Sequence, residues 1–212
     1  MQKYNKYIEY VKNAFKNSFE KAGGNNYRFY HCINTANIAK YIAKELNLSE
    51  KETEIVILAA LLHDIGKIEQ IQENGFLDHS SVYEALHNLE RHENVSARMV
   101  YDILKDDFSK DIIDTVANII KDDMQDNILA HILHDADDIS ELGYMNVIRL
   151  FTYNHDKSIE HITQHYLHTD KQKKEKKLEK LHFDISRKLA NERLAKTEDF
   201  LIKLHQEIGL IK

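Results

Sequence analysis

The hydrophobic positions of this chain recur at helical spacing over most of its length. Residues 3–21 carry apolar side chains three and four positions apart, and residues 28–46 do the same. Ser49 and Glu52 form a Ser-x-x-Glu pattern, which predicts the start of a third helix. That helix contains the uninterrupted apolar run Ile55–Leu62, and we expect it to lie at the centre of the molecule.

The same periodicity predicts helices near residues 95–106, 109–121, 126–137, 143–153 and 173–210. Residues 68–94 are polar and irregular, with a short helix expected near 79–90. Residues 154–170 show little periodicity and are expected to form a surface loop with one helical turn. Strand alternation is scarce and proline is absent, so the sequence predicts an all-α fold.

Composition narrows the class of protein. A chain of 212 residues can bury a sizeable core, and its net charge of −6 gives no basic surplus for binding a nucleic-acid polymer. Cys32 is the one cysteine, which excludes an internal disulfide and suggests a reducing compartment. The longest apolar run is too short to span a bilayer, and the N-terminus has no apolar signal core. We therefore expect a cytoplasmic protein without membrane partners.

Candidate chemistry begins where the apolar run ends. His63 and Asp64 follow it directly, and burying them costs free energy unless they are paired or bind a metal. His31 lies 32 positions before His63, and Asp137 lies in an acidic cluster far downstream. These side chains supply nitrogen and oxygen ligands for one hard or borderline divalent cation. Asp135, in the same cluster, is expected to support the site or to lie at the surface rather than to bind the ion.

The segment 59–67, which reads Ala-Ala-Leu-Leu-His-Asp-Ile-Gly-Lys, resembles the central motif of the HD-domain superfamily of metal-dependent phosphohydrolases. His31 and Asp137 stand in the order of that family's first and last metal motifs. Residues 92–97 resemble the start of its next helix, and residues 189–201 are similar to the end of a small bacterial subfamily of predicted hydrolases.

The resemblance covers residues 28–205 and implies an HD-domain-like helical bundle with a long C-terminal helix. We predict a single domain over residues 1–212, with an HD core at about 28–140 and a C-terminal helical extension at about 141–212. The long terminal helix is also a candidate surface for a homodimer.

The resemblance implies that one divalent cation, which is Mn, Mg, Co, Ni, Fe or Zn, is held by His31, His63, Asp64 and Asp137. The implied reaction is hydrolysis of a phosphoester or pyrophosphate bond by metal-activated water. The expected substrate is a small phosphorylated molecule, with a nucleotide favoured.

Other residues have more specific expected roles. Asp64, Lys67 and His92 are the predicted catalytic residues: Asp64 orients water, Lys67 neutralises phosphate charge, and His92 serves as acid, base or auxiliary ligand. Lys67, Arg149 and Arg193 are the predicted substrate-binding residues. The alternative for Lys67 is a solvated surface lysine, and for the arginines it is an ordinary salt bridge.

Two departures from the family keep other functions open. Residues 121–123 stand where many relatives carry a histidine that helps hold a second ion, and Asp138 stands where relatives often carry arginine. They motivate a non-catalytic nucleotide-binding regulatory module as the alternative, with an iron-dependent oxygenase less favoured.

Further patterns are interpreted as structural. The run 171–177 holds five lysines, which we interpret as a solvated helix start, with a phosphate-attracting rim as the alternative. His131 and His134 share a helical face, as do His161, His165 and His168, but neither set has a carboxylate in register. We expect no metal at either set.

Overall fold

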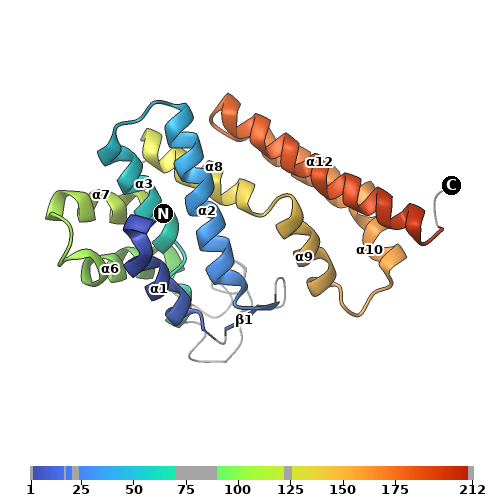
Figure 1. Ribbon diagram of the computed structural model, residues 1–212, viewed down its shortest axis with the longest axis horizontal. Helices are drawn as coiled ribbons and strands as arrows, with labels where there is room; N and C mark the ends of the chain where they lie inside the picture. Colours follow the sequence, from blue (N-terminus) through green and yellow to red (C-terminus); the bar gives the residue numbers. More distant parts are fainter. Residues whose placement is uncertain (1, 17, 21–23, 70–89, 122–125, 210–212) are drawn as a thin grey trace.

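The computed structural model describes residues 2–16, 18–20, 24–69, 90–121 and 126–209 (Figure 1). Its α-helices are α1 (Asn5–Ala14), α2 (Tyr27–Glu45), α3 (Glu50–Leu62), α6 (His92–Leu104), α7 (Lys110–Lys121), α8 (Ile128–Ser140), α9 (Tyr144–Tyr153), α10 (Ile159–His165), α11 (Lys171–Leu178) and α12 (Asp184–Glu207). A 3-10 turn (Gln2–Tyr4) precedes α1, and a π-helical turn (Tyr166–Asp170) joins α10 to α11. The predicted all-α fold is confirmed.

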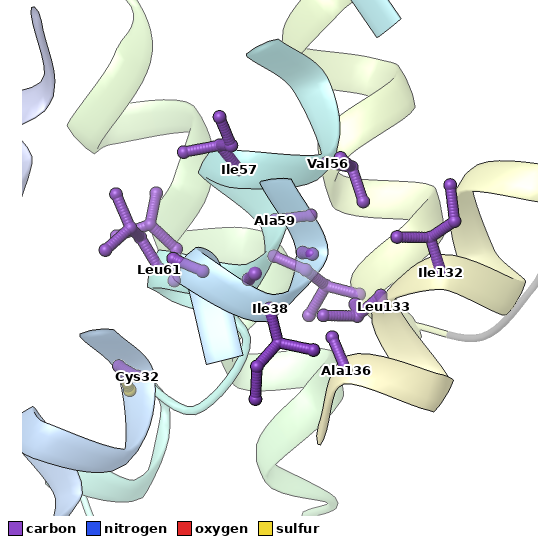
Figure 2. Close-up of a cluster of buried hydrophobic side chains, with 14 of the residues drawn as sticks. Cys32, Ile38, Val56, Ile57, Ala59, Leu61, Ile132, Leu133 and Ala136 are labelled. Carbon is purple, nitrogen blue, oxygen red and sulfur yellow. The ribbon is translucent and has the colours of Figure 1, made fainter. Parts of the chain in front are cut away.

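Helix α3 lies among α1, α2, α7 and α8 and is in contact with all four (Figure 1). All eight residues of Ile55–Leu62 are buried, which is the pattern of a helix surrounded by other helices. Figure 2 shows how Ile38 of α2, Val56 of α3 and Ile132 of α8 point into the same cluster. The core therefore holds together the three helices that carry the His and Asp motifs.

Capping side chains fix where the central helices begin. Ser49 and Glu52 form the predicted capping box at the start of α3, with Glu52 accepting from the Ser49 backbone N–H at 2.9 Å. Asn127 caps α8 by accepting from the Leu129 N–H at 2.8 Å. Each cap satisfies backbone donors that the first helical turn leaves unpaired, so the register of both helices is set locally.

The N-terminal prediction was partly wrong, because the first helix ends at Ala14 rather than at residue 21. The Ser18 hydroxyl donates to the Phe15 carbonyl at 2.7 Å and turns the chain out of the helix. In the described ranges, the only β-structure follows here: strands β1 (Phe19–Glu20) and β2 (Gly24–Asn25) pair antiparallel. Local turn chemistry thus overrides helical periodicity.

Two C-terminal predictions were also wrong in detail. Residues 154–170 contain α10, whose N-cap Ser158 accepts from the His161 N–H at 3.1 Å, and a π-helical turn rather than a loop. The long helix expected over 173–210 is divided into α11 and α12 by a break at residues 179–183. The short helix expected near residues 79–90 falls almost wholly outside the described residues. No helix in the described ranges has the length and apolar run needed to cross a membrane.

Candidate metal centre

The four predicted ligands lie together although three different parts of the fold supply them. His31 comes from α2, His63 and Asp64 from the turn that follows α3, and Asp137 from α8. The Nε2 atoms of His31 and His63 are 3.2 Å apart, and Asp137 Oδ1 lies 3.0 Å from the first and 3.4 Å from the second. Asp64 Oδ2 lies 3.4 Å and 3.5 Å from the same two nitrogens. Two nitrogens and two oxygens therefore converge on one point.

Hydrogen bonds at the far side of each ring determine which nitrogen is available to a ligand. His63 Nδ1 lies 2.9 Å from the Ala60 carbonyl, which only accepts, so Nδ1 carries the proton and Nε2 the lone pair. The Ser140 hydroxyl donates to the Asp137 carbonyl at 2.7 Å, so its oxygen accepts from His31 Nδ1 at 3.0 Å. Both rings thus present Nε2 as a donor of electrons, which is the second-sphere arrangement found around metal-bound histidines.

The centre is buried except at Asp137. His31, His63 and Asp64 are all buried, whereas the Asp137 side chain keeps 46% of its surface exposed. A ligand would reach the four donor atoms from the Asp137 side. Access of this kind is what a catalytic metal site needs and a closed structural site lacks.

Asp64 is held by three cationic or titratable partners. Arg28 donates to its Oδ2, Lys67 Nζ lies 2.8 Å from its Oδ1, and His92 Nε2 lies 3.2 Å from the same oxygen. Burial alone would raise the pKa of Asp64, but the charges of Arg28, His63 and Lys67 outweigh it and hold the pKa well below its usual range. Lys67 is only 8% exposed, so the alternative of a solvated surface lysine is wrong.

Sequence reasoning missed Arg28. This residue is 4% exposed and lies three positions before His31, hence on the same face of α2. The available signal was an arginine one helical turn ahead of the first histidine, on a face that has to pack into the core. The structure adds it to the site as a second cation beside Lys67.

Gly66 explains how His92 reaches the centre. A Cβ at this glycine would lie 2.4 Å from the His92 carbonyl oxygen and 2.6 Å from the Ser96 nitrogen, too close for any side chain. The Gly66 N–H donates to the Ser96 hydroxyl at 2.8 Å. The turn after Asp64 can therefore lie directly against the start of α6, which carries His92.

Arg149 and Arg193 reach His31 only through other residues, Arg149 through Tyr27 and Arg193 through Asn34 and Ser140. Arg149 donates to the Tyr27 hydroxyl at 2.8 Å and pairs with Glu141 at 2.9 Å, and the Tyr27 ring stacks on His31 with centroids 6.0 Å apart. Arg193 bonds the Asn34 side chain at 3.3 Å. Both arginines brace the centre through protein contacts, and their substrate-binding role stays a prediction.

A second cluster forms on the opposite side of α8. Atoms of His134, Asp135 and His182 lie within 4.8 Å of one another, and the His131 ring stacks on His182 with centroids 3.9 Å apart. A carboxylate therefore does accompany His131 and His134. The Asp135 oxygens accept from the backbone N–H groups of His182 and Phe183 and from His182 Nδ1, so Asp135 ties the α11–α12 break to α8. It is fully buried, not a surface carboxylate.

Comparison with known proteins agrees with this geometry. The family model of the HD domain matches residues 28–142, more than half of the chain. The chain belongs to the HD domain family. No curated protein matches it significantly.

Solved structures of similar fold cover nearly the whole chain. A predicted HD superfamily hydrolase from an uncultured Thermotogales bacterium matches with a TM-score of 0.64 at 21% identity, over 97% of this chain and 92% of its own. An HD-superfamily hydrolase from Bacillus thuringiensis matches with a TM-score of 0.63 at 18% identity, over 98% and 97%. Bacillus subtilis YpgQ in complex with ADP matches with a TM-score of 0.62 at 18% identity, over 97% and 95%. Family membership together with the His and Asp cluster supports a metal-dependent hydrolase.

Proposed function

We propose that this HD domain is a metal-dependent phosphohydrolase that cleaves a phosphoester or pyrophosphate bond of a small phosphorylated substrate, a nucleotide. One observation carries the proposal. Two histidine Nε2 atoms and two carboxylate oxygens converge, with access at Asp137, next to the buried cations Arg28 and Lys67. Cations beside such a centre suit a substrate that carries several negative charges.

The donor set fits one divalent cation. His31, His63, Asp64 and Asp137 would hold it, and two imidazoles with two carboxylates are compatible with Mn, Co, Ni, Fe and Zn, and less specifically with Mg. When bound, such an ion polarises a phosphoryl oxygen and lowers the pKa of the water bound to it, so that this water can lose a proton near neutral pH.

The protein's own residues would then divide the remaining work. The Oδ2 atom of Asp64 faces the two imidazoles, and its Oδ1 atom contacts Lys67 and His92. Arg28 and Lys67 supply fixed positive charge for phosphoryl oxygens, a contribution that is largest where water is excluded. His92 Nε2 is placed to hold or deliver a proton, and its Nδ1 lies 3.4 Å from the carboxylate of Glu93.

The nucleotide assignment rests on two supports. A structural neighbour was solved with ADP, and Arg149 next to Tyr27 offers a guanidinium beside an aromatic ring, 5.1 Å from its centroid. Arg149 and Arg193 are the proposed substrate-binding arginines. The lone buried Cys32 is consistent with the cytoplasm, where nucleotides are abundant, and homodimer formation through α12 remains part of the proposal.

Release of phosphate or pyrophosphate from a panel of nucleoside mono-, di- and triphosphates tests the proposal, with Mn, Mg, Co and Ni supplied in turn. We expect turnover with at least one metal and one nucleotide, abolished in Asp64→Ala. The control Asp102→Asn, an α6 carboxylate whose side chain is 86% exposed, should behave as wild type. Tight binding of a nucleotide without turnover would instead favour the regulatory module, and redox-active iron in the purified protein would favour the oxygenase.

A further inference from the structure

A second feature of the molecule is an open cavity of about 490 Å³ between α9 and α11. Its volume lies in the range of small-molecule binding sites. The described residues that line it include Asn146, Arg149, Tyr153 and the α11 lysines Lys173, Lys174 and Lys177, and none of the four predicted metal ligands. It is therefore a separate space, reached from the metal centre through the contact of Arg149 with Tyr27.

The cavity is strongly cationic in a protein of net charge −6. Its four positive side chains face a single lining carboxylate, Asp170. The existing counter-charges are distant or shared: Lys173 lies 3.9 Å from Asp170, and Lys177 lies 3.5 Å from Asp138. Pairs this long and this exposed neutralise little charge, so the wall attracts an anion.

Lys174 gives the sharper indication. Burial lowers the pKa of its ammonium group, because a charged group in this position loses part of its contact with water. In the described part of the chain Lys174 makes no hydrogen bond or ion pair, and its most strongly interacting carboxylate, Glu141, is already paired with Arg149. A partly buried ammonium without a partner destabilises the empty protein and is relieved when an anion enters.

Asn146 provides an independent indication of the same kind. Its side chain is 3% exposed, it lines the cavity, and its Nδ2 has no hydrogen-bond partner among the described residues. Buried amide donors are nearly always satisfied, so an unsatisfied one next to a cavity indicates a missing acceptor. Lys174 and Asn146 are both donors, and a ligand rich in acceptor oxygens would satisfy both.

We infer that this cavity binds a phosphorylated small molecule through its phosphate groups. Arg149, Lys174 and Lys177 contact the phosphate oxygens, Asn146 donates to an acceptor atom of the same ligand, and the half-exposed Tyr153 ring offers a flat face to a base. The five-lysine run thus contains a phosphate-binding wall. The inference does not depend on turnover at the metal centre.

Two substitutions test it with a signature that a purely structural role would not give. Lys174→Met and Asn146→Leu each replace an unsatisfied polar group with an apolar one of similar size. We expect each variant to melt at or above the wild-type temperature and yet to bind inorganic diphosphate and ADP at least 10-fold more weakly by titration calorimetry. The matched control Lys176→Met, an exposed lysine on the same helix, should bind both probes as wild type does.

Calorimetry in the presence of a chelator keeps the metal centre out of the measurement. Equal affinity in wild type, Lys174→Met and Asn146→Leu would overturn the inference, as would failure of wild type to bind either probe. If Lys174→Met raises the KM of the active enzyme, the phosphate belongs to the substrate itself. If KM is unchanged, and added diphosphate alters the turnover of wild type but not that of Lys174→Met, the phosphate belongs to a separate ligand. Binding of the probes without turnover of any nucleotide would contradict only the proposed hydrolysis.

Discussion

Arg28 and Asp64 form a buried ion pair between α2 and the turn after α3, and each side chain is no more than 5% exposed. Lys67 pairs with the other oxygen of Asp64. Two buried cations therefore balance the carboxylates of Asp64 and Asp137 before any metal enters. A divalent ion would leave the centre with a net positive charge, which complements a phosphate. The pair thus prepares the centre electrostatically for an anionic substrate.

Arg28→Met tests this charge balance. Removing one partner of a buried pair typically costs about 3–5 kcal/mol, and we expect the lower end because Lys67 still contacts Asp64. Chemical denaturation without metal should show this loss, and added Mn should recover part of it, since the ion supplies positive charge at the same carboxylate. The control Arg98→Met removes an exposed partner of Glu90 and should change stability little. No loss in Arg28→Met would mean that the pair is energetically unimportant.

Ser140→Ala tests how the His31 ring is oriented. Without the hydroxyl, Nδ1 loses its acceptor and the tautomer that exposes Nε2 is no longer favoured. Loss of such an outer partner typically weakens metal binding by about 10–100-fold. The matched control Thr115→Ala removes a similar hydroxyl, which donates to the Asp111 carbonyl of α7 at 2.7 Å. Equal metal affinity in both variants would contradict the tautomer assignment.

The sequence was sufficient for the parts of the fold that local chemistry determines. The α3 capping box and the fully apolar run after it appear where they were predicted, because a cap and a run are contiguous in the chain. The helix boundaries in the N-terminal and C-terminal segments were harder to predict. The break at residues 179–183 depends on Asp135, which lies 47 positions before His182 and accepts its N–H groups. No local pattern in the lysine-rich segment indicates that contact.

The candidate metal centre also has a part that the sequence predicts and a part that only the tertiary structure reveals. His31, His63, Asp64 and Asp137 could be proposed from motif order, whereas the burial of Lys67 and the pairing of Arg28 could not. Both properties depend on how closely α2 and α6 approach the turn after α3. That approach is a tertiary distance, and the amino-acid types alone leave it open.

Asp135→Asn and Asp137→Asn form a matched pair on one helix. Asp135 accepts buried bonds from the α11–α12 break, so its substitution should destabilise the fold by about 1–3 kcal/mol and leave metal affinity near wild type. Asp137 is partly exposed and faces the two imidazoles, so its substitution should weaken metal binding and affect stability less. Thermal unfolding and metal titration separate the two outcomes. If Asp135→Asn lost metal while Asp137→Asn kept it, the assigned ligand would be wrong.

Gly66→Ala tests the close approach of the turn to α6. The added methyl group would meet the backbone at His92 and Ser96, which cannot rotate away as a side chain can. Overpacking of this kind typically costs about 1–3 kcal/mol or more, and displacement of His92 should also reduce turnover. Gly209→Ala is the comparison: nothing lies within 4 Å of its Cβ, and only the positive φ of 75° opposes the change. Equal stability losses in the two variants would mean that α6 moves freely.

Metal binding should release protons near neutral pH. Burial lowers the pKa of His63, but the carboxylates of Asp64 and Asp137 outweigh it and raise the pKa above its ordinary value of 6.5 in the metal-free protein. His63 protonation therefore stabilises the metal-free fold at low pH, and this contribution is lost as pH rises through the raised pKa. A cation needs the deprotonated Nε2, so its apparent affinity should increase over the same pH range. Calorimetry of Mn binding in buffers of different ionisation enthalpy measures the released protons as a slope. A slope of zero at pH 7, with binding intact, would show that His63 is already neutral and that the two carboxylates do not control its charge.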